Sequence, residues 1–441
     1  MENPATIFAL STPRGRGAVG IIRISGPAAG DAVRALIGKL PPPRRASLAR
    51  IRHPSSAELL DRALCLWFPA PGSYTGEDLA EFHVHGGPAV VSGVLEALAD
   101  LPGLVPAEPG AFSRRAFEHG RLDLTAAEGI ADLIEAETAA QRRVALAATD
   151  GRLAELVERW RTTLLQAMAL IEAEIDFPDE DLGDGLRAQA RVKIEVLHRA
   201  IAAHRADATQ GERLRVGFRV ALLGEPNVGK SSLLNAIAQR EVAIVTDLPG
   251  TTRDVLEVHL DLGGYPVILA DMAGLREAGD PVEAIGIARA KERAQQADLR
   301  LLLVEAVNKD DPLPAVLRSQ HKAGDLVVLT KADLSHPAIG DPIATSSQTG
   351  EGIATLLAAL EDRAAASLGG SDSPLFSRVR HRRHLQDCIS SLEAVLGAFD
   401  GEAELLAEDL RRAADALGRL TGRIDAEEVL GSIFAEFCIG K

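Results

Sequence analysis

Residues 224–232 read Gly224-Glu225-Pro226-Asn227-Val228-Gly229-Lys230-Ser231-Ser232 and fit the pattern G-x-x-x-x-G-K-[ST]. The apolar run 216–223 before this stretch predicts a buried strand, and the run 232–238 after it predicts a helix. A strand, a glycine-rich turn and a helix N-terminus together form an anion site, because backbone N–H groups converge there and the helix dipole favours negative charge. We therefore expect a phosphate-binding loop in which Lys230 reaches the outer phosphates and Ser231 ligates Mg²⁺.

Segments further along the chain indicate which nucleotide this loop binds. The β-rich run 326–329 leads into Thr330-Lys331-Ala332-Asp333. A carboxylate at a strand end can accept two hydrogen bonds that guanine donates and adenine does not, so Asp333 predicts GTP rather than ATP. A second run, 265–270, ends in Asp271-Met272-Ala273-Gly274, where Asp271 would approach Mg²⁺ through water and Gly274 would approach the γ-phosphate. Thr345-Ser346-Ser347 is positioned to contact the base.

Composition limits the classes of protein that this chain can be. The 441 residues predict two to four domains, no run of eighteen apolar residues indicates a transmembrane helix, and the N-terminus lacks a signal-peptide pattern. Three distant cysteines, Cys65, Cys388 and Cys438, suit a reducing, cytoplasmic compartment. A net charge of −15 with 3% aromatic residues disfavours stand-alone binding of nucleic acid. An RNA substrate would therefore need a local basic patch or a partner.

Residues 1–118 are predicted to form an α+β domain, with strands at 6–10, 19–24, 63–68 and 79–84 and helices at 27–40 and 89–98. A helical stretch follows, for which Thr125 and Glu128 match a capping box. One apolar helix face recurs at three- and four-residue steps up to Phe177-Pro178, with a break near Asp150-Gly151; its members are Leu153, Leu156, Val157, Trp160, Leu164, Met168 and Ile171. We expect Trp160 to be a core residue and residues 186–208 to form a second helix.

Residues 213–370 alternate strand and helix patterns, which predicts a mainly parallel sheet with helices on both faces. Alternation over 256–262 followed by Gly263-Gly264 predicts a hairpin within it. After a linker at 369–374, helical patterns return at 384–399 and 402–420. The expected fold is thus a multidomain α/β plus α protein: an α+β domain at 1–118, a discontinuous helical domain at 119–212 and 371–441, and an inserted Ras-like P-loop GTPase domain at 213–370.

The catalytic water needs a positioning group, because Leu275 stands where many small GTPases have a glutamine. Carboxylates close by can orient water, and the candidates are Glu277, Asp280 and Glu283, although chemistry alone favours a solvated surface charge for each of them. Asn227 offers a neutral oxygen ligand that could help to hold a monovalent cation beside the phosphates. Arg253 is either an arginine finger in cis or the ion-pair partner of a neighbouring acid.

The chain resembles the MnmE (TrmE) family of GTPases that modify the wobble uridine of tRNA, and the resemblance covers essentially the whole length. The segments that resemble the family are Thr12-Pro13, Gly15-Arg16-Gly17, residues 20–26, Tyr74-Thr75-Gly76-Glu77-Asp78, His85-Gly86-Gly87-Pro88, residues 175–180, Gly250-Thr251-Thr252-Arg253-Asp254 and the end Phe437-Cys438-Ile439-Gly440-Lys441. Two motifs depart from the family pattern, because Met272 replaces the Thr of D-T-A-G and Thr330 replaces the Asn of N-K-x-D. Neither change removes a phosphate or metal ligand.

The resemblance implies an N-terminal domain that resembles folate-binding domains and dimerises. It implies a homodimer that works with the FAD protein MnmG, in a heterotetramer, on tRNA. The product would carry a carboxymethylaminomethyl or aminomethyl group on carbon 5 of the wobble uridine. The one-carbon unit would come from 5-formyltetrahydrofolate or 5,10-methylenetetrahydrofolate.

The resemblance also implies roles for residues of this chain. Glu283 would orient the catalytic water, Mg²⁺ would be held by Ser231 and Thr252, and K⁺ by Asn227, Thr246, the Leu248 carbonyl and Thr251. Folate would contact Arg23, Glu81, Arg121 and Lys441. The GTP-binding residues would be Asn227, Val228, Gly229, Lys230, Ser231, Ser232, Thr246, Asp247, Leu248, Pro249, Gly250, Thr251, Thr252, Asp271, Met272, Ala273, Gly274, Thr330, Lys331, Asp333, Ser346 and Ser347.

Two alternatives stay open at the level of the sequence. The chain could be a GTP-switch protein for ribosome assembly or membrane docking without modification activity, although the acidic balance disfavours a ribosome partner. The basic stretch 378–384 could contact tRNA phosphates, or it could be a solvated helix start.

Overall fold

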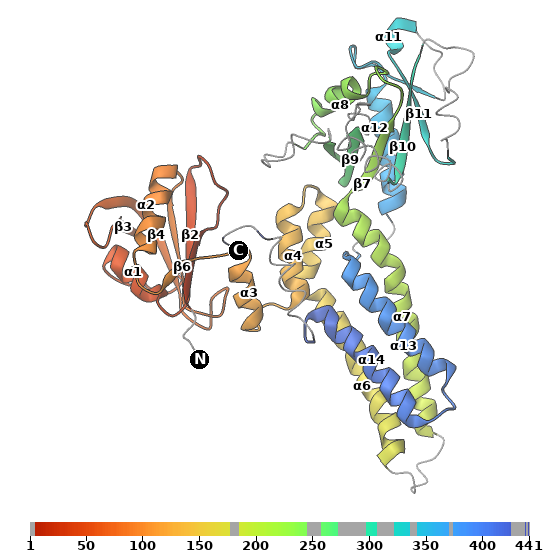
Figure 1. Cartoon of the computed structure of the whole chain (residues 1–441), viewed down its shortest axis with the longest axis horizontal. Helices are drawn as coiled ribbons and strands as arrows, with labels where there is room; N and C mark the ends of the chain where they lie inside the picture. The colour runs from red at the N-terminus through yellow and green to blue at the C-terminus, as the bar shows by residue number, and fades with distance from the viewer. Residues whose placement is uncertain are drawn as a thin grey trace, which may run out of the picture. The chain divides into compact units, whose positions relative to one another are not determined.

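The computed structural model describes residues 5–176, 185–244, 257–271, 297–306, 322–335, 342–369, 374–424, 437 and 440. The chain divides into two compact units. Figure 1 shows its helices and strands, coloured along the chain. The first contains Met1–Ala131, Ala148–Thr162 and Ala414–Lys441, and the second contains Asp132–Ala147 and Thr163–Ala413.

A six-stranded sheet forms the centre of the N-terminal part of the first unit. Its strands are β1 (Thr6–Leu10), β2 (Val19–Ser25), β3 (Ser47–Arg52), β4 (Leu59–Phe68), β5 (Leu79–His85) and β6 (Leu104–Pro106). Their order is β3-β4-β5-β2-β1-β6, antiparallel except for β1 with β6. The four predicted strands are confirmed, and β3 and β6 are additional because their sequences are too short or too charged to signal a strand.

Helices cover one face of this sheet and part of the other. On one face, α1 (Ala29–Ile37) and α2 (Pro88–Ala99) bury the apolar residues of β2 to β5, including Ile22, Phe82 and Trp67. On the other face, Phe112 of α3 (Ala111–Glu118) packs with Ile7 and Ala9 of β1. On this second face, α3 therefore covers β1, and the other strands present their side chains beyond α3.

The helical elements are α4 (Leu124–Glu135), α5 (Ala139–Thr149), α6 (Arg152–Asp176), α7 (Gly185–Val216), α13 (Val379–Gly397) and α14 (Ala403–Thr421). The apolar face predicted for α6 is confirmed: Trp160 is 6% exposed, and only Leu156 of the set is half-buried. The helical stretch is interrupted at Gly151, as expected, and α6 ends at Asp176. In the second unit α13 packs along α7.

The predicted capping box at α4 is wrong, because the cap lies two residues earlier. Asp123 Oδ1 accepts hydrogen bonds from the backbone N–H groups of Thr125 and Ala126 at 2.8 and 2.9 Å, and from the Thr125 hydroxyl. A carboxylate at this position satisfies two free N–H groups and favours the positive end of the helix dipole. Thr125 is consequently inside the helix and buried.

The second unit contains another six-stranded sheet, in the order β12-β11-β10-β7-β9-β8. Its strands are β7 (Phe218–Leu223), β8 (Glu257–Leu262), β9 (Tyr265–Asp271), β10 (Leu299–Glu305), β11 (Leu326–Thr330) and β12 (Ile343–Ala344), with helices α8 (Lys230–Ala238), α11 (Ala332–Ser335) and α12 (Ile353–Leu368). All neighbours are parallel except β8 and β9. The carboxyl ends of five strands therefore share one edge of the sheet.

The predicted hairpin is confirmed within this sheet. Leu262 pairs with Tyr265, so the turn has two residues, Gly263 and Gly264, with φ of 59° and 88°. Such a turn requires positive φ at both positions, which glycine adopts without strain. The strand expected at 216–223 begins later, because Val216 is still the last residue of α7.

Candidate functional site

The phosphate-binding loop joins β7 to α8 at the carboxyl edge of the parallel sheet. Gly224 leaves β7, and a Cβ there would lie 2.8 Å from the Leu303 carbonyl oxygen, so only glycine fits between the strands. Asn227 and Gly229 have φ of 64° and 100°, which turns the chain into the helix. The predicted strand–loop–helix unit is confirmed.

Lys230 lies inside this loop with 6% of its surface exposed. Its Nζ donates to the carbonyl oxygens of Gly224 and Glu225, both at 2.8 Å. Burial lowers the pKa of the Lys230 ammonium, and the nearby Asp271 carboxylate opposes that shift. The ammonium is thus held at the loop by weakly basic carbonyls, and it can transfer its hydrogen bonds to a phosphate that enters.

The oxygens of Ser231 and Asp271 lie together beside the loop. The Ser231 hydroxyl donates to Asp271 Oδ2 at 3.2 Å, and Asp271 at the end of β9 is 6% exposed. A hydroxyl and a carboxylate are the hard oxygen ligands that Mg²⁺ prefers, and Mg²⁺ commonly binds one or two protein oxygens, waters and substrate phosphates. These two residues fit a magnesium ion, with Asp271 acting directly or through water.

Thr330 connects the base-recognition segment to the phosphate loop. Its hydroxyl lies 2.6 Å from the Val228 carbonyl oxygen and 3.2 Å from that of Val304, and the side chain is buried. From the motif N-K-x-D, the sequence predicts only that Thr330 lacks the side-chain amide of the usual asparagine. The structure shows that the hydroxyl joins the end of β11 to the loop after β7.

The other base-recognition residues lie at the ends of β11 and β12. Lys331 adopts φ of 57°, and its Nζ lies 3.1 Å from Glu305 Oε1. Asp333 is half-buried in the first turn of α11. The fully buried Ser346 hydroxyl accepts hydrogen bonds from the N–H groups of Gln348 and Thr349, so this side chain shapes its own loop.

Several predicted GTP and metal residues lie outside the described residues. They are Thr246, Asp247, Leu248, Pro249, Gly250, Thr251, Thr252, Met272, Ala273, Gly274 and Glu283, and the same holds for Lys441 and Cys438.

Burial raises the pKa of the Cys65 and Cys388 thiols to about 12, so both are neutral. Across the described part of the chain, no cluster of three metal-ligating side chains occurs, and no helix is long and apolar enough to cross a membrane.

A second charged site lies on the N-terminal sheet, where Arg23 and Glu81 are cross-strand neighbours. Arg23 Nε and one terminal nitrogen donate to Glu81 Oε1 at 3.0 and 2.9 Å, and His83 Nε2 lies 3.3 Å from Glu81 Oε2. The Arg23 guanidinium lies over the rings of Tyr74 and Phe112, 5.3 and 5.6 Å from their centroids. Burial raises the pKa of Tyr74, so its hydroxyl, 2.8 Å from that of Ser113, is neutral.

The other two predicted folate residues are placed only in part. Arg121 is exposed and lies against the 74–78 turn, since a Cβ at Gly76 would be 3.3 Å from Arg121 Cγ. Gly440, next to Lys441, accepts a hydrogen bond from the Ser11 hydroxyl at 2.9 Å, just after β1. The two ends of this unit therefore meet at the N-terminal sheet.

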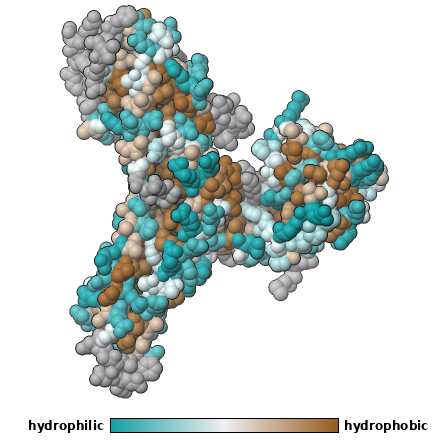
Figure 2. All heavy atoms as spheres, turned by 180° about the vertical axis from the view of Figure 1, so that it is seen from behind, coloured by the Kyte–Doolittle hydropathy of each residue, from teal (hydrophilic) through white to brown (hydrophobic). Residues whose placement is uncertain are grey.

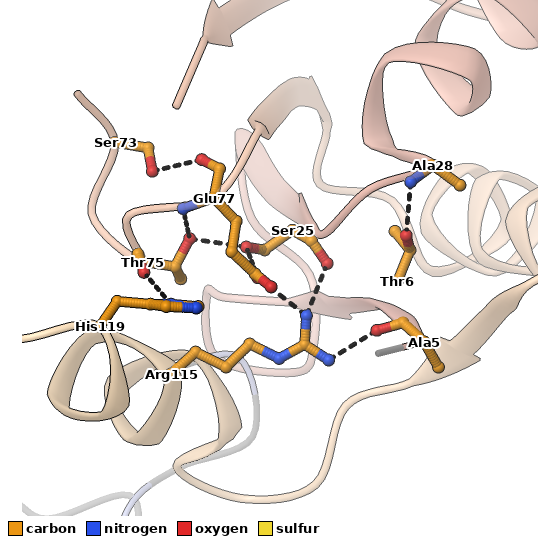
Figure 3. A network of polar contacts seen from close by, with 9 residues as sticks. All are labelled: Ala5, Thr6, Ser25, Ala28, Ser73, Thr75, Glu77, Arg115 and His119. Carbon is orange, nitrogen blue, oxygen red and sulfur yellow. Dashed lines mark hydrogen bonds and ion pairs between the residues drawn. The ribbon is translucent and has the colours of Figure 1, made fainter. Parts of the chain in front are cut away.

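Sequence reasoning missed the network that holds the 73–78 turn in place (Figure 3). One nitrogen of Arg115 donates to Glu77 Oε2 at 2.8 Å and to the Ser25 carbonyl at 3.2 Å, and the other donates to the Ala5 carbonyl. The Ser25 and Thr75 hydroxyls are 2.7 Å apart, and His119 Nδ1 donates to the Thr75 carbonyl. By fixing this turn and α3, the network holds Tyr74 and Phe112 over Arg23.

The basic stretch 378–384 is not an exposed patch as a whole. Arg378 is 8% exposed and donates to Asp132 Oδ1 at 2.6 Å, and His381 is 3% exposed. Arg382 lies 3.4 Å from Glu212. Arg378 and His381 are therefore packed within the second unit, whereas Arg382 and Arg383 are exposed. Contact of this stretch with tRNA phosphates stays a prediction.

Comparison with known proteins shows which family this chain resembles over its length. Residues 6–121 match the family model of the GTP-binding protein TrmE N-terminus, and residues 124–438 match that of the MnmE helical domain. The tRNA modification GTPase MnmE of Phenylobacterium zucineum is 52% identical over 449 residues, which cover 99% of each chain. The chain belongs to the MnmE family.

A human relative extends the comparison to mitochondria. The 5-taurinomethyluridine-[tRNA] synthase subunit GTPB3 of Homo sapiens is 49% identical over 461 residues, covering 99% of this chain and 93% of the relative. As a member of the MnmE family, the chain is a GTP hydrolase that uses Mg²⁺, and the loop geometry is consistent with both.

Proposed function

We propose that the chain is a potassium-stimulated GTPase that, together with MnmG, modifies carbon 5 of the wobble uridine of certain tRNAs. The group added is carboxymethylaminomethyl or aminomethyl, and its one-carbon unit comes from a tetrahydrofolate. The observation that supports this most is the Arg23–Glu81 pair, held beneath Tyr74 and Phe112 in a chain that also has a phosphate loop. A GTP switch alone has no use for such a second site.

In the proposed GTPase reaction, each residue of the loop binds or orients one part of the substrate. Lys230 holds the outer phosphates, and Asp333 selects guanine through two accepted hydrogen bonds. Ser231 and Thr252 would hold Mg²⁺, which neutralises charge on the phosphates, and Asp271 would support the ion through water. Asn227, Thr246, the Leu248 carbonyl and Thr251 would hold K⁺. Glu283 would orient the attacking water.

The proposed consequence of hydrolysis is movement of the helical domain. We assign the domains to residues 1–118, to 119–212 with 371–441, and to 213–370. In sequence, the β8–β9 hairpin joins the two segments that would sense the γ-phosphate. Two hydrogen bonds connect it to helical residues: the Ala140 N–H donates to the Gly264 carbonyl at 3.2 Å, and His259 Nδ1 lies 2.9 Å from Glu137 Oε2. Displacement of the hairpin would therefore pull on the helices.

In the proposed assembly, two GTPase domains of a homodimer approach in the GTP state and separate after hydrolysis. MnmG joins the dimer in a heterotetramer in the cytoplasm. Replacement of Glu283 with Ala should then lower GTP turnover and leave GTP affinity near that of the wild type. Turnover in KCl should exceed turnover in NaCl at equal ionic strength, and equal rates would exclude the K⁺ ligands.

Two measurements test the modification activity itself. Titration of the purified protein with 5-formyltetrahydrofolate should saturate, and Arg23→Ala should abolish that binding while GTP hydrolysis continues. Nucleoside analysis of tRNA from cells that lack the protein should show loss of the modified wobble uridine. If the nucleosides are unchanged and no folate binds, the chain is instead a GTP switch for ribosome assembly.

A further inference from the structure

The β3–β4 hairpin presents a basic surface on the face of the N-terminal sheet opposite α1. Alternate residues of β3, namely Leu48, Arg50 and Arg52, are exposed, whereas Ile51 between them is buried. On β4, Arg62 and Leu64 lie directly opposite Arg50 and Leu48 and are also exposed. We call the five residues Leu48, Arg50, Arg52, Arg62 and Leu64 the hairpin patch.

The pairing of Arg50 with Arg62 is unfavourable in the absence of an anion. Like charges directly opposite each other on two strands destabilise a sheet. Across the described residues, neither arginine forms an ion pair, and the acid beside them is engaged elsewhere. Asp61 accepts hydrogen bonds from the backbone and ring of His85 and from the Arg62 N–H, and these outweigh partial burial and lower its pKa.

Several arginines in the second unit have acidic partners instead. Arg187 pairs with Glu174, Arg191 with Glu195, and both Arg215 and Arg378 with Asp132. The chain has 63 acidic residues against 48 basic ones, so partners are plentiful. Residues 39–62 reverse this balance, with six Lys or Arg and two acids, a local charge of 6 − 2 = +4. The local positive charge, together with two facing arginines that form no ion pair among the described residues, therefore distinguishes this hairpin from the acidic chain as a whole.

The chemistry of the patch fits phosphate groups better than a second copy of the chain. Guanidinium groups bind phosphate oxygens in pairs of parallel hydrogen bonds. A two-fold contact centred on the patch would instead place the same arginines against each other. The patch has no aromatic side chain for base stacking, so it suits the backbone of RNA rather than its bases. Figure 2 shows the N-terminal domain as the lobe on the right, with hydrophobic residues exposed among hydrophilic ones.

The register of the sheet connects the patch to the Arg23–Glu81 site. Leu64 pairs with His83 and Leu66 with Glu81, so Arg62 lies on β4, the strand next to β5 with Glu81, and Arg50 lies one strand further on the same sheet. A tRNA backbone that lies on the hairpin would be close to the proposed one-carbon donor. We propose that the hairpin patch is a docking surface for the phosphate backbone of tRNA. The identity of the RNA rests on the proposed function.

The test compares tRNA binding of the full-length protein at several KCl concentrations. The variants are R50A/R62A and, with the charge kept, R50K/R62K; the control R34A/R205A removes two exposed arginines from α1 and α7. Each lost phosphate contact should reduce the slope of log Kd against log salt by about 1, so R50A/R62A should lower it by about 2. Affinity should fall by roughly tenfold at low salt, since each contact is strongly salt-dependent. R50K/R62K and the control should retain most of the slope.

Three results would overturn the docking surface. One is the same slope and affinity for R50A/R62A as for the control. Another is altered dimerisation in sedimentation with unchanged tRNA binding, which would make the patch a contact between copies. The third is wild-type protein that binds no tRNA. GTP hydrolysis and folate binding show whether R50A/R62A is folded. If the wild-type protein lacks these two activities, the proposed function is contradicted independently of the docking surface.

Discussion

The two six-stranded sheets of this chain hold their sites in different places. In the parallel sheet, the polar groups of the site lie at the carboxyl ends of strands, where β7, β9 and β11 bring Lys230, Asp271 and Thr330 to one edge. In the antiparallel sheet, Arg23 and Glu81 stand within β2 and β5, on a face that α1 and α2 leave open. A parallel sheet is covered by helices on both faces, so only its edge can bind a ligand. An antiparallel sheet can use a face.

The largest expected effect separates the two sites at the phosphate loop. Lys230→Ala removes the ammonium from a buried position at the loop, and we expect GTP turnover to fall by roughly 100-fold or more, as when a positioned transition-state donor is lost. Binding of 5-formyltetrahydrofolate should stay at the wild-type level in the same preparation. Loss of both activities would mean that the sites are not independent, or that the variant fails to fold, which circular dichroism would distinguish.

The reciprocal change is made on the antiparallel sheet. The side chains of Arg23 and Glu81 are only 20% and 16% exposed. Arg23→Ala leaves the Glu81 carboxylate with His83 as its remaining partner among the described contacts. We expect the free energy of unfolding to fall by about 1–3 kcal/mol, with folate binding lost and GTP turnover kept. Arg23→Lys keeps the positive charge without the paired N–H groups of the guanidinium, so its free energy of unfolding should fall less than that of Arg23→Ala. Unchanged unfolding in urea would show that the ion pair does not stabilise the sheet.

A smaller effect is expected at the connection between β11 and the phosphate loop. Thr330→Val keeps the shape but removes the hydroxyl that donates to the Val228 carbonyl. We expect GDP and GTP to bind about fivefold to tenfold more weakly, which corresponds to the net value of about 1 kcal/mol for a hydrogen bond. Thr330→Ser restores the hydroxyl and is the matched control. Equal affinities for the Val and Ser variants would assign no positioning role to this contact.

The smallest expected effect concerns the arginines that face each other on the open sheet. Arg62→Ala relieves the repulsion with Arg50, so the protein should become more stable by roughly 0.2–1 kcal/mol at low salt. The gain should shrink as salt increases, because exposed charges are screened. Arg34→Ala, which removes an arginine paired with Asp31, is the control. Destabilisation by Arg62→Ala at low salt would show that packing of the arginine stem outweighs the repulsion.

The two sheets also differ in how well the sequence predicts them. The phosphate loop is a contiguous segment whose function depends on its own backbone, so the motif predicts both the site and its geometry. The hairpin at Gly263-Gly264 is likewise local. The Arg23–Glu81 pair depends on the register of strands 58 residues apart in sequence, and only resemblance to a family pointed to it.

Errors at single residues have the same origin. The cap of α4 is Asp123 rather than Thr125, because two candidate acceptors stood two residues apart and only the chain geometry selects between them. Arg378 and His381 read as part of a basic surface, but packing in the second unit buries them, and Arg378 pairs with Asp132, 246 positions earlier. Two residues that far apart in sequence leave no local pattern from which their pairing could be predicted. β3 was missed because its exposed face carries arginines.

The amino-acid sequence determined the phosphate loop and the alternation of strands and helices, because each depends on residues that are neighbours in the chain. The tertiary structure decided which polar groups meet: Thr330 with Val228, Arg115 with Glu77, Asp132 with two arginines, and Arg50 with no acid at all among the described residues. The physical reason is that charge and hydrogen-bond pairing act over a few ångströms in space, a separation that folding sets and sequence spacing does not.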